Sequence, residues 1–235
     1  MRLLVTRPDE DAAPLMAALE AMGHEAVHAP LLTVRHLPDA VVPDEAWAGL
    51  LVTSANGVRA LTARAFFSDF LSVPVFAVGD ASAAAARAAG FRHVVSAAGD
   101  VASLAELVVR QAPAGPLLHV AGTVVAGDLA GLLAAQGFRV HRAVLYEAVA
   151  ADHLPDAVVV ALKAGNFDGI LIFSPRTGAV LKRLIEAAGL QALLEDLTAY
   201  CLSQAVADAL RGLPFGRVVV AAEPRQEALL ALIEK

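Results

Sequence analysis

Two segments about 120 residues apart, Gly49-Leu50-Leu51-Val52-Thr53-Ser54 and Gly169-Ile170-Leu171-Ile172-Phe173-Ser174, decide the fold of this chain. Each is an apolar run that ends in a small polar residue, as expected for a buried strand followed by a helix N-cap. The similarity extends outward to four more pairs of segments. They are Leu3 to Thr6 with Leu118 to Ala121, Met22 to Val27 with Gln136 to Val140, Phe76 to Gly79 with Tyr200 to Ser203, and Val94 to Ala98 with Val218 to Ala222. A repeat of this size predicts two similar units.

Both units are predicted to be α/β domains with parallel sheets, because short β-branched runs alternate with Ala- and Leu-rich stretches of helical period. Several of these stretches end at a glycine suited to the position after a helix, as at Gly23, Gly90, Gly137 and Gly189. The expected strands are Leu3 to Thr6, Glu25 to His28, Gly49 to Thr53, Val73 to Val78, His93 to Ser96, Leu117 to Ala121, Arg139 to His141, Gly169 to Phe173, Thr198 to Leu202 and Arg217 to Ala221.

Two extended stretches, Pro30 to Pro43 and Ala143 to Pro155, separate a short strand-helix-strand piece from the rest of each half. If both run from one domain to the other, they form a two-stranded hinge, and the first piece packs with the C-terminal half. One domain then comprises residues 1–30 and 156–235, the other comprises residues 37–142, and residues 31–36 and 143–155 are the hinge. The residues alone leave a second arrangement open, a tandem split near Pro113.

Composition and charge exclude several classes of protein. The chain has 235 residues and a net charge of −6, with acidic and basic residues interspersed, so we expect neither nucleic acid nor an anionic membrane as a partner. The longest apolar runs are far shorter than a membrane-spanning helix. Cys201 is the one cysteine, which rules out an internal disulfide. Without a recognisable signal peptide, the expected location is the cytoplasm.

The common cofactor, metal and hydrolase motifs are missing. No G-x-G-x-x-G follows the first strand, and no G-x-S-x-G surrounds a serine. Gly122 to Gly127 has the glycine spacing of a phosphate loop, but Asp128 and Leu129 stand where Lys and Ser or Thr are required. The histidines show no metal-ligand spacing. We therefore expect no cofactor and no metal.

Small polar residues recur at the carboxyl ends of the predicted strands, where open α/β sheets bind ligands. The segments are Thr6-Arg7-Pro8, Thr53-Ser54-Ala55-Asn56-Gly57, Gly79-Asp80-Ala81-Ser82, Ala121-Gly122-Thr123, Ser174-Pro175-Arg176-Thr177 and Ser203-Gln204. Each is expected to precede a helix, so any one of them has a purely structural interpretation as an N-cap. Together, six helix N-termini offer free N–H groups and positive dipole ends to a multiply anionic ligand.

Tyr146, one of two tyrosines, falls in the second extended stretch and not in an expected core strand. Its phenol faces a cleft between the domains, or else its ring is a packed aromatic with a satisfied hydroxyl.

Six segments, in this order, are similar to motifs of a known enzyme family. They are Val5-Thr6-Arg7-Pro8, Thr53-Ser54-Ala55-Asn56-Gly57-Val58, Phe76-Ala77-Val78-Gly79-Asp80-Ala81-Ser82-Ala83, Ser96-Ala97-Ala98-Gly99-Asp100, Leu145-Tyr146-Glu147 and Phe173-Ser174-Pro175-Arg176-Thr177. Each motif is short, so the resemblance rests on their shared order over nearly the whole chain. On these motifs the chain resembles the uroporphyrinogen-III synthase family of cofactor-independent enzymes.

This resemblance implies two domains joined by a two-stranded ladder, and a reaction of haem biosynthesis on hydroxymethylbilane, a linear tetrapyrrole with eight carboxylates. In the family's scheme the terminal hydroxyl leaves as water to give an azafulvene, which attacks the substituted carbon of the last pyrrole ring. The spiro intermediate fragments and recloses with ring D inverted, giving uroporphyrinogen III. Catalysis of this kind is mainly positioning of the substrate in the interdomain cleft, and we expect a monomer.

The resemblance also implies residue roles. Tyr146 matches the family's hinge tyrosine, which assists departure of the hydroxyl, and Ser82 matches the family's Ser or Thr of the first domain. Val206 stands where the second domain often has Thr, so that hydroxyl is missing or is supplied by Ser203. The expected substrate contacts are Thr6, Arg7, Ser54, Asn56, Gly79, Ser82, Gly122, Ser174, Arg176 and Ser203. A non-catalytic two-lobed binding or regulatory protein for a small anion is the alternative.

Overall fold

The computed structural model describes residues 1–125 and 127–233 and divides the chain into two compact units. Unit 1 comprises Met1–Thr33 and Val149–Lys235, and unit 2 comprises Val34–Ala148. The last two residues of the range 156–235 assigned to one domain lie outside the described residues. Residues 1–33 belong with the C-terminal half, so the tandem split near Pro113 is wrong.

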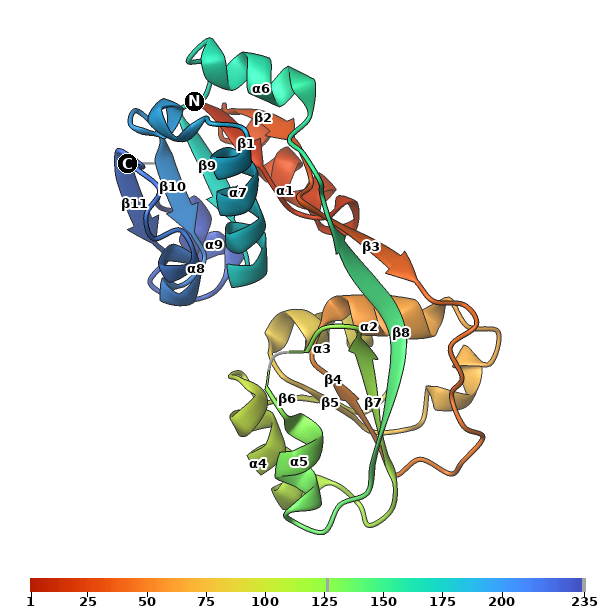
Figure 1. The fold of residues 1–235 in the computed structure, drawn as a ribbon. Helices are drawn as coiled ribbons and strands as arrows, with labels where there is room; N and C mark the ends of the chain where they lie inside the picture. The colour runs from red at the N-terminus through yellow and green to blue at the C-terminus, as the bar shows by residue number, and fades with distance from the viewer. Residues whose placement is uncertain (126, 234–235) are drawn as a thin grey trace. The chain divides into compact units, whose positions relative to one another are not determined.

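Unit 1 is built on a five-stranded parallel sheet in the order β11-β10-β9-β1-β2 (Figure 1). Its elements are β1 (Arg2–Val5), α1 (Asp9–Ala21), β2 (Glu25–His28), α6 (Asp156–Lys163), β9 (Gly169–Ile172), α7 (Pro175–Ala187), the 3-10 turn η2 (Gln191–Leu194), β10 (Thr198–Cys201), α8 (Gln204–Ala209), β11 (Arg217–Val220) and α9 (Gln226–Leu230). In the register of β1 and β9, Leu3 lies opposite Gly169. The first strand therefore pairs with a strand 166 residues later.

Helices cover both faces of this sheet, which explains why its strands read as continuous apolar runs. Leu4 packs on the face covered by α6, α7 and α8, where Leu181 and Ile185 of α7 are fully buried. Leu3 and Val5 point to the opposite face, where α1 and α9 contribute Leu19 and other leucines. Each fully buried leucine contributes about 1.5–3 kcal/mol of hydrophobic stabilisation, so alternate residues of one strand hold both helical layers.

Unit 2 is built on a six-stranded sheet in the order β3-β8-β7-β4-β5-β6. Its elements are β3 (Leu32–His36), β4 (Gly49–Val52), α2 (Ala55–Thr62), the 3-10 turn η1 (Phe67–Phe70), β5 (Val75–Ala77), α3 (Asp80–Ala88), β6 (Val94–Ser96), α4 (Val101–Gln111), β7 (Leu117–Gly122), α5 (Leu129–Ala134) and β8 (Val140–Ala150). The pairings of β4 with β5 and β7, of β5 with β6, and of β7 with β8 are all parallel. One face is covered by α2 and α3 and the other by α4 and α5. The predicted class, two α/β domains with parallel sheets, is confirmed.

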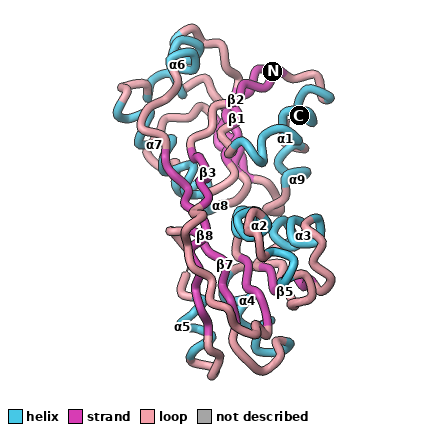
Figure 2. The backbone as a smooth tube through the Cα atoms, turned by 90° about the vertical axis from the view of Figure 1, so that its right-hand side faces the viewer, coloured by secondary structure: helices cyan, strands magenta, loops and turns pink. Residues whose placement is uncertain are grey.

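β8 is longer than the sequence predicted. The short strand Arg139 to His141 and the extended stretch after it form one strand of 11 residues, Val140–Ala150. β3 runs beside β8 (Figure 2), with backbone hydrogen bonds from Leu37 to Leu145 at 2.8 Å and from Ala151 to Leu31 at 3.0 Å. The chain crosses between the units inside these two strands, after residue 33 and after residue 148.

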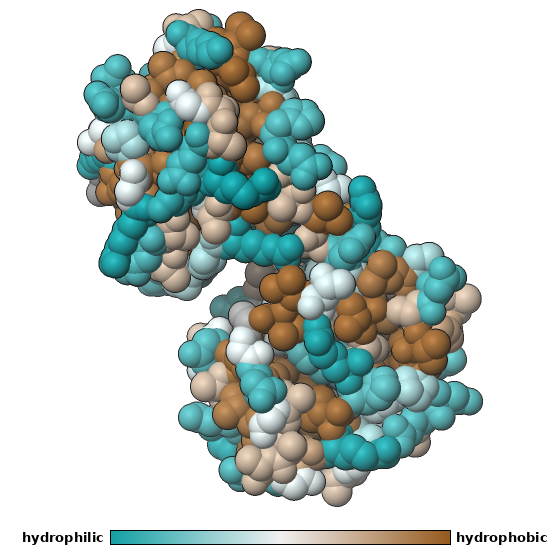
Figure 3. All heavy atoms as spheres, in the orientation of Figure 1, coloured by the Kyte–Doolittle hydropathy of each residue, from teal (hydrophilic) through white to brown (hydrophobic). Residues whose placement is uncertain are grey.

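Polar and apolar side chains are interspersed on the face of each unit that Figure 3 shows. Within the described residues, no helix combines the length and the apolar character that a bilayer-spanning helix needs.

Candidate active site

Each sheet reverses its strand order at one point, and the carboxyl ends of the strands beside such a point form the usual ligand-binding edge of an α/β sheet. In unit 1 the reversal lies between β1 and β9, and in unit 2 it lies between β4 and β7. Thr6 and Ser174 follow the strands at the first reversal, and Ser54 and Thr123 follow those at the second. The sequence therefore placed its polar candidates at both reversal points.

Thr6 does not offer its side chain to a ligand. It is 0% exposed, and its hydroxyl donates a hydrogen bond of 2.7 Å to the carbonyl of Leu171. This bond joins β1 to β9 inside the sheet. The Thr6 hydroxyl therefore holds the reversal point together, and the substrate contact of Thr6, which stays a prediction, falls to its backbone.

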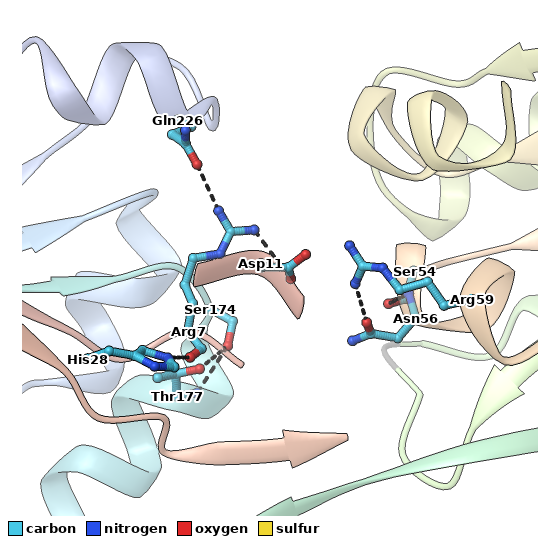
Figure 4. Close-up of polar contacts among 9 residues, drawn as sticks. All are labelled: Arg7, Asp11, His28, Ser54, Asn56, Arg59, Ser174, Thr177 and Gln226. Carbon is cyan, nitrogen blue, oxygen red and sulfur yellow. Dashed lines mark hydrogen bonds and ion pairs between the residues drawn. The ribbon is translucent and has the colours of Figure 1, made fainter. Parts of the chain in front are cut away.

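Arg7 is fixed by three partners at the edge of unit 1, of which Figure 4 shows Asp11 and Gln226. Its guanidinium lies 4.4 Å from the ring centroid of Phe173, donates to Gln226 at 3.0 Å, and is 3.4 Å from a carboxylate oxygen of Asp11. The carbonyl of Arg7 accepts a hydrogen bond of 2.9 Å from His28. Arg7 is thus a rigid cation, partly neutralised by Asp11.

The N-terminus of α1, which follows Arg7, is a poor place for a further anion. Its first turn holds Asp9, Glu10 and Asp11, whose negative charges already face the positive end of the helix dipole. The expectation that all six helix N-termini offer free positive ends to an anionic ligand is wrong here. The sequence itself contains these three acids, and they distinguish this helix start from the others.

The N-terminus of α7 is better suited to an anion, since its first turn contains no acid. The Ser174 hydroxyl caps the helix by accepting a hydrogen bond of 3.0 Å from the N–H of Thr177, and the two hydroxyls are 2.8 Å apart (Figure 4). Arg176 lies in the same turn, directly after Pro175. Ser174 is therefore an N-cap that also holds Thr177 at this edge. Thr177 belongs to one of the predicted polar segments but was not among the expected substrate contacts.

Ser203 and Val206 differ in their surroundings. Ser203 stands at the start of α8 and makes no side-chain cap, so its hydroxyl is not committed to the helix. Val206 is buried in the apolar layer of unit 1. The residue that replaces the expected hydroxyl therefore packs in the core, and Ser203 stays the predicted polar contact at this strand end.

The edge of unit 2 begins with α2, whose first turn also contains no acid. Ser54 accepts a hydrogen bond of 3.2 Å from the N–H of Asn56, and the Asn56 carbonyl oxygen accepts one of 2.6 Å from Arg59 (Figure 4). A Cβ on Gly57 would come within 2.9 Å of the Val120 carbonyl oxygen, so only glycine lets α2 pack this closely on β7. Arg59 was not predicted, although it lies three residues after Asn56 on one helix face.

Gly79 and Ser82 lie at the start of α3. Gly79 occupies the N-cap position and has no side chain, so it leaves the N–H groups of the first turn uncapped. Ser82 is only 5% exposed. The first turn carries one acid, Asp80, which makes this end less favourable for an anion than that of α2.

Gly122 does not precede a helix, contrary to expectation. It is the last residue of β7, and α5 begins only at Leu129, with the Asp128 side chain as its N-cap. A Cβ on Gly122 would lie 2.8 Å from two ring atoms of Tyr146. Gly122 is therefore covered by the aromatic ring of the proposed catalytic residue.

Tyr146 lies in β8 and is 8% exposed, packed in the apolar layer beneath α2 and α3. Its carbonyl accepts a hydrogen bond of 3.0 Å from the N–H of Thr123. Its hydroxyl makes no hydrogen bond within the described part of the chain and is not among the fully enclosed polar atoms that lack a partner. The ring is thus a packed aromatic, as one interpretation held, while the hydroxyl keeps its capacity to bond a ligand.

His119 and Arg142 lie opposite each other in the register of β7 and β8. His119 is 3% exposed and hydrogen-bonds the Thr53 hydroxyl at 3.3 Å. Burial, reinforced by the nearby guanidinium of Arg142, lowers the pKa of His119 to about 4. The imidazole is therefore neutral at pH 7, and the Thr53 hydroxyl has a neutral partner at the end of β4.

We expect His119 to make the fold acid-sensitive. Its pKa is about 4 in the fold against 6.5 when exposed, so the unfolded chain binds the extra proton. The associated stability is complete above pH 6.5 and is lost as the pH falls towards 4, in total ~3 kcal/mol. Urea unfolding between pH 4 and 8 measures this slope. His119→Gln should flatten it, while His93→Gln, at an exposed histidine, should not; an unchanged slope in His119→Gln would contradict the assignment.

The described residues contain no group of three or more His, Cys, Asp or Glu side chains arranged to hold a metal ion. The groups that the structure places at the two edges are helix N-termini, arginines and one phenol, all of which are hydrogen-bond donors. Such a set binds anions and positions them, and it supplies a single weak acid.

Comparisons with known proteins found one matching family and similar solved structures. The family model described as uroporphyrinogen-III synthase HemD matches residues 13–231. The chain is similar to the crystal structure of uroporphyrinogen-III synthetase from Helicobacter pylori, with 18% identity, a TM-score of 0.68, and coverage of 99% of this chain and 98% of that one. It is also similar to a mutant uroporphyrinogen III synthase from Thermus thermophilus, with 21% identity, a TM-score of 0.57, and coverage of 100% and 97%. Among curated protein sequences, none matches. The two structures show a shared fold, and the family match spans nearly the whole chain.

Proposed function

The chain belongs to the uroporphyrinogen-III synthase family, and from this premise we propose how its residues carry out the family's reaction. The enzyme is a lyase of tetrapyrrole biosynthesis. It cyclises hydroxymethylbilane to uroporphyrinogen III with loss of water and inversion of ring D. The family match over residues 13–231 is the observation that carries this function. A non-catalytic binding protein for a small anion is not favoured.

We propose that the substrate carboxylates bind at the N-termini of α2 and α7. Both helices begin beside the reversal point of a sheet, and neither has an acid in its first turn. N–H groups and dipole ends attract anions without a cluster of free cations, which suits a chain with a net charge of −6. Asn56 and Arg176 are then the polar side chains nearest these ends.

Tyr146 is proposed as the group that assists departure of the hydroxyl. The pyrrole nitrogen supplies the electron pair that expels the terminal oxygen, and the phenol donates a hydrogen bond or proton to that oxygen, so that water leaves. The pyrrole nitrogen gives up its own proton to leave a neutral azafulvene, and this proton replaces the one taken up by the departing oxygen. A hydroxyl without another partner in the described chain is available for this bond. The other steps need the substrate ends to be held in contact, which is a matter of positioning.

We further propose that β3 and β8, inside which the chain crosses between the units, act as the hinge between two domains. The enzyme is proposed to work without a cofactor, as a monomer, in the cytoplasm. The even mixture of charges supports the absence of a nucleic-acid partner.

The function is tested by adding the purified chain to hydroxymethylbilane and following its disappearance. The rate should rise in proportion to enzyme concentration above that of the spontaneous cyclisation. A rate independent of enzyme concentration would contradict the function.

Substituting Arg7 by Ala should have a limited effect on binding. A charged hydrogen bond is worth on the order of 1–3 kcal/mol, and Arg7 is already shared with Asp11 and Gln226, so we expect KM to rise by less than about tenfold. Arg2→Ala is the matched control, because Arg2 also contacts an acid, Glu25, and an aromatic ring, at the other end of β1. Steady-state kinetics should show an unchanged KM for Arg2→Ala. Complete loss of binding in Arg7→Ala would mean that binding depends on this one cation.

A further inference from the structure

The backbone conformation at Gly122 does not require glycine. Gly122 lies in β7 and does not adopt the left-handed φ that favours glycine. Its lack of a side chain matters for a different reason. The place of a Cβ is 2.8 Å from Cε2 and Cζ of the Tyr146 ring and 3.1 Å from its hydroxyl oxygen. Real Cβ atoms do not approach other atoms this closely, so any side chain at position 122 would push the phenol end of the ring away.

A register shift brings these two residues together. Ala121 of β7 lies opposite Val144 of β8, but Gly122 lies opposite Tyr146, so β8 carries one extra residue, Leu145, at this point. Such a bulge changes the direction of the side chains that follow it. Leu145 and Tyr146 are both buried on the face covered by α2 and α3, whereas a regular strand would send consecutive side chains to opposite faces.

We propose that Gly122 is a positioning residue for Tyr146 and not a substrate-binding residue. Its open Cα provides the surface on which the ring lies, and this contact fixes where the hydroxyl points. The inference rests on the proposed role of Tyr146 in the reaction.

Arg142 supports the same arrangement. One guanidinium nitrogen donates to the carbonyl of Gly122 at 2.6 Å and to the carbonyl of Thr123 at 3.0 Å. The N–H of Thr123 in turn bonds the carbonyl of Tyr146. Arg142 thus holds the two peptides at the end of β7, and with them the surface beneath the ring.

The test compares Gly122→Ala in the native chain and in Tyr146→Phe. Moving the phenol should lower kcat about tenfold to a hundredfold with little change in KM. In Tyr146→Phe the hydroxyl is already gone, so the added Ala should change kcat by less than about twofold, a non-additivity expected of residues in contact. Gly49→Ala is the matched control, because its Cβ would meet the Phe76 ring at 3.0 Å at the opposite end of the sheet. It should lower stability but leave kcat unchanged.

Equal losses of kcat in both backgrounds would overturn the inference, since Gly122 would then act on the substrate or on the fold. Full activity of Tyr146→Phe alone would instead refute the proposed role of Tyr146, and with it the reason to position the ring. If Gly122→Ala does not fold, Arg142→Met carries the same comparison. Its loss of kcat must likewise disappear when residue 146 is Phe, and a loss that persists there contradicts the inference.

Discussion

Tyr146→Phe is expected to lower kcat about tenfold to a hundredfold while uroporphyrinogen III remains the main enzymatic product. A positioned acid typically contributes a hundredfold to ten-thousandfold, and the low end or below it is expected because the pyrrole nitrogen already drives departure of the hydroxyl. The ring of Phe keeps the packing beneath α2 and α3, so the melting temperature should hardly change. Rate and isomer ratio are measured in the same reaction.

Tyr200→Phe is the matched control for this experiment. Tyr200 is the other tyrosine, it is buried in unit 1, and its hydroxyl has the Met1 sulfur as a distant partner at 4.0 Å. Removing the same atom there should leave kcat unchanged. Full activity of Tyr146→Phe would show that Tyr146 contributes only the packing of its ring and that its hydroxyl has no role in the reaction. A switch to the type I isomer would show that the hydroxyl orients ring D and does not act on the leaving group.

Ser54→Asp and Ser174→Asp should each raise KM about tenfold, and roughly a hundredfold in combination. Aspartate is as good an N-cap as serine, so the hydrogen bonds from Asn56 and Thr177 survive and the helices keep their starts. The new carboxylate, however, faces a multiply carboxylated substrate at the same helix end, and the repulsion between such neighbours near a surface costs roughly 1–2 kcal/mol. The effects add because the two serines belong to different units.

Gln136→Glu serves as the control for added charge. Gln136 is exposed and follows the C-terminus of α5, away from the strand ends that carry the candidate residues. The same change in net charge should leave KM within about twofold, since screening weakens distant charges. If Ser54→Asp and Ser174→Asp resemble this control, carboxylates do not bind at α2 and α7, and the cations elsewhere must hold them.

The sequence predicted the strands of this fold well because buried parallel strands leave a plain apolar pattern. Gly49–Val52 and Gly169–Ile172 are buried throughout, and their spacing revealed the repeat. The polar residues after these strands could be predicted to lie together, since a parallel sheet has the carboxyl ends of its strands at one edge. Ser54 and Ser174 were found in this way, and both are N-caps in the structure.

What the sequence did not show are contacts between distant segments. Gln226 accepts a hydrogen bond from Arg7, which lies 219 residues earlier in the chain, and no local sequence pattern predicts this contact. The bulge that places Tyr146 over Gly122 depends on the register of β7 and β8. The periodicity of apolar residues does not predict a strand register to within one residue. The burial of the Thr6 hydroxyl likewise follows from the pairing of β1 with β9, since a threonine after a strand usually suggests an exposed cap.

The isomer composition of the product formed from hydroxymethylbilane tests the proposed function most directly. The substrate is incubated with and without the purified chain, the products are oxidised to porphyrins, and the type I and type III isomers are separated by chromatography. Spontaneous cyclisation gives type I, so we expect type III to predominate when the chain is present and to increase with its concentration. Type I alone, formed at the rate of the reaction without protein, would contradict the proposed function.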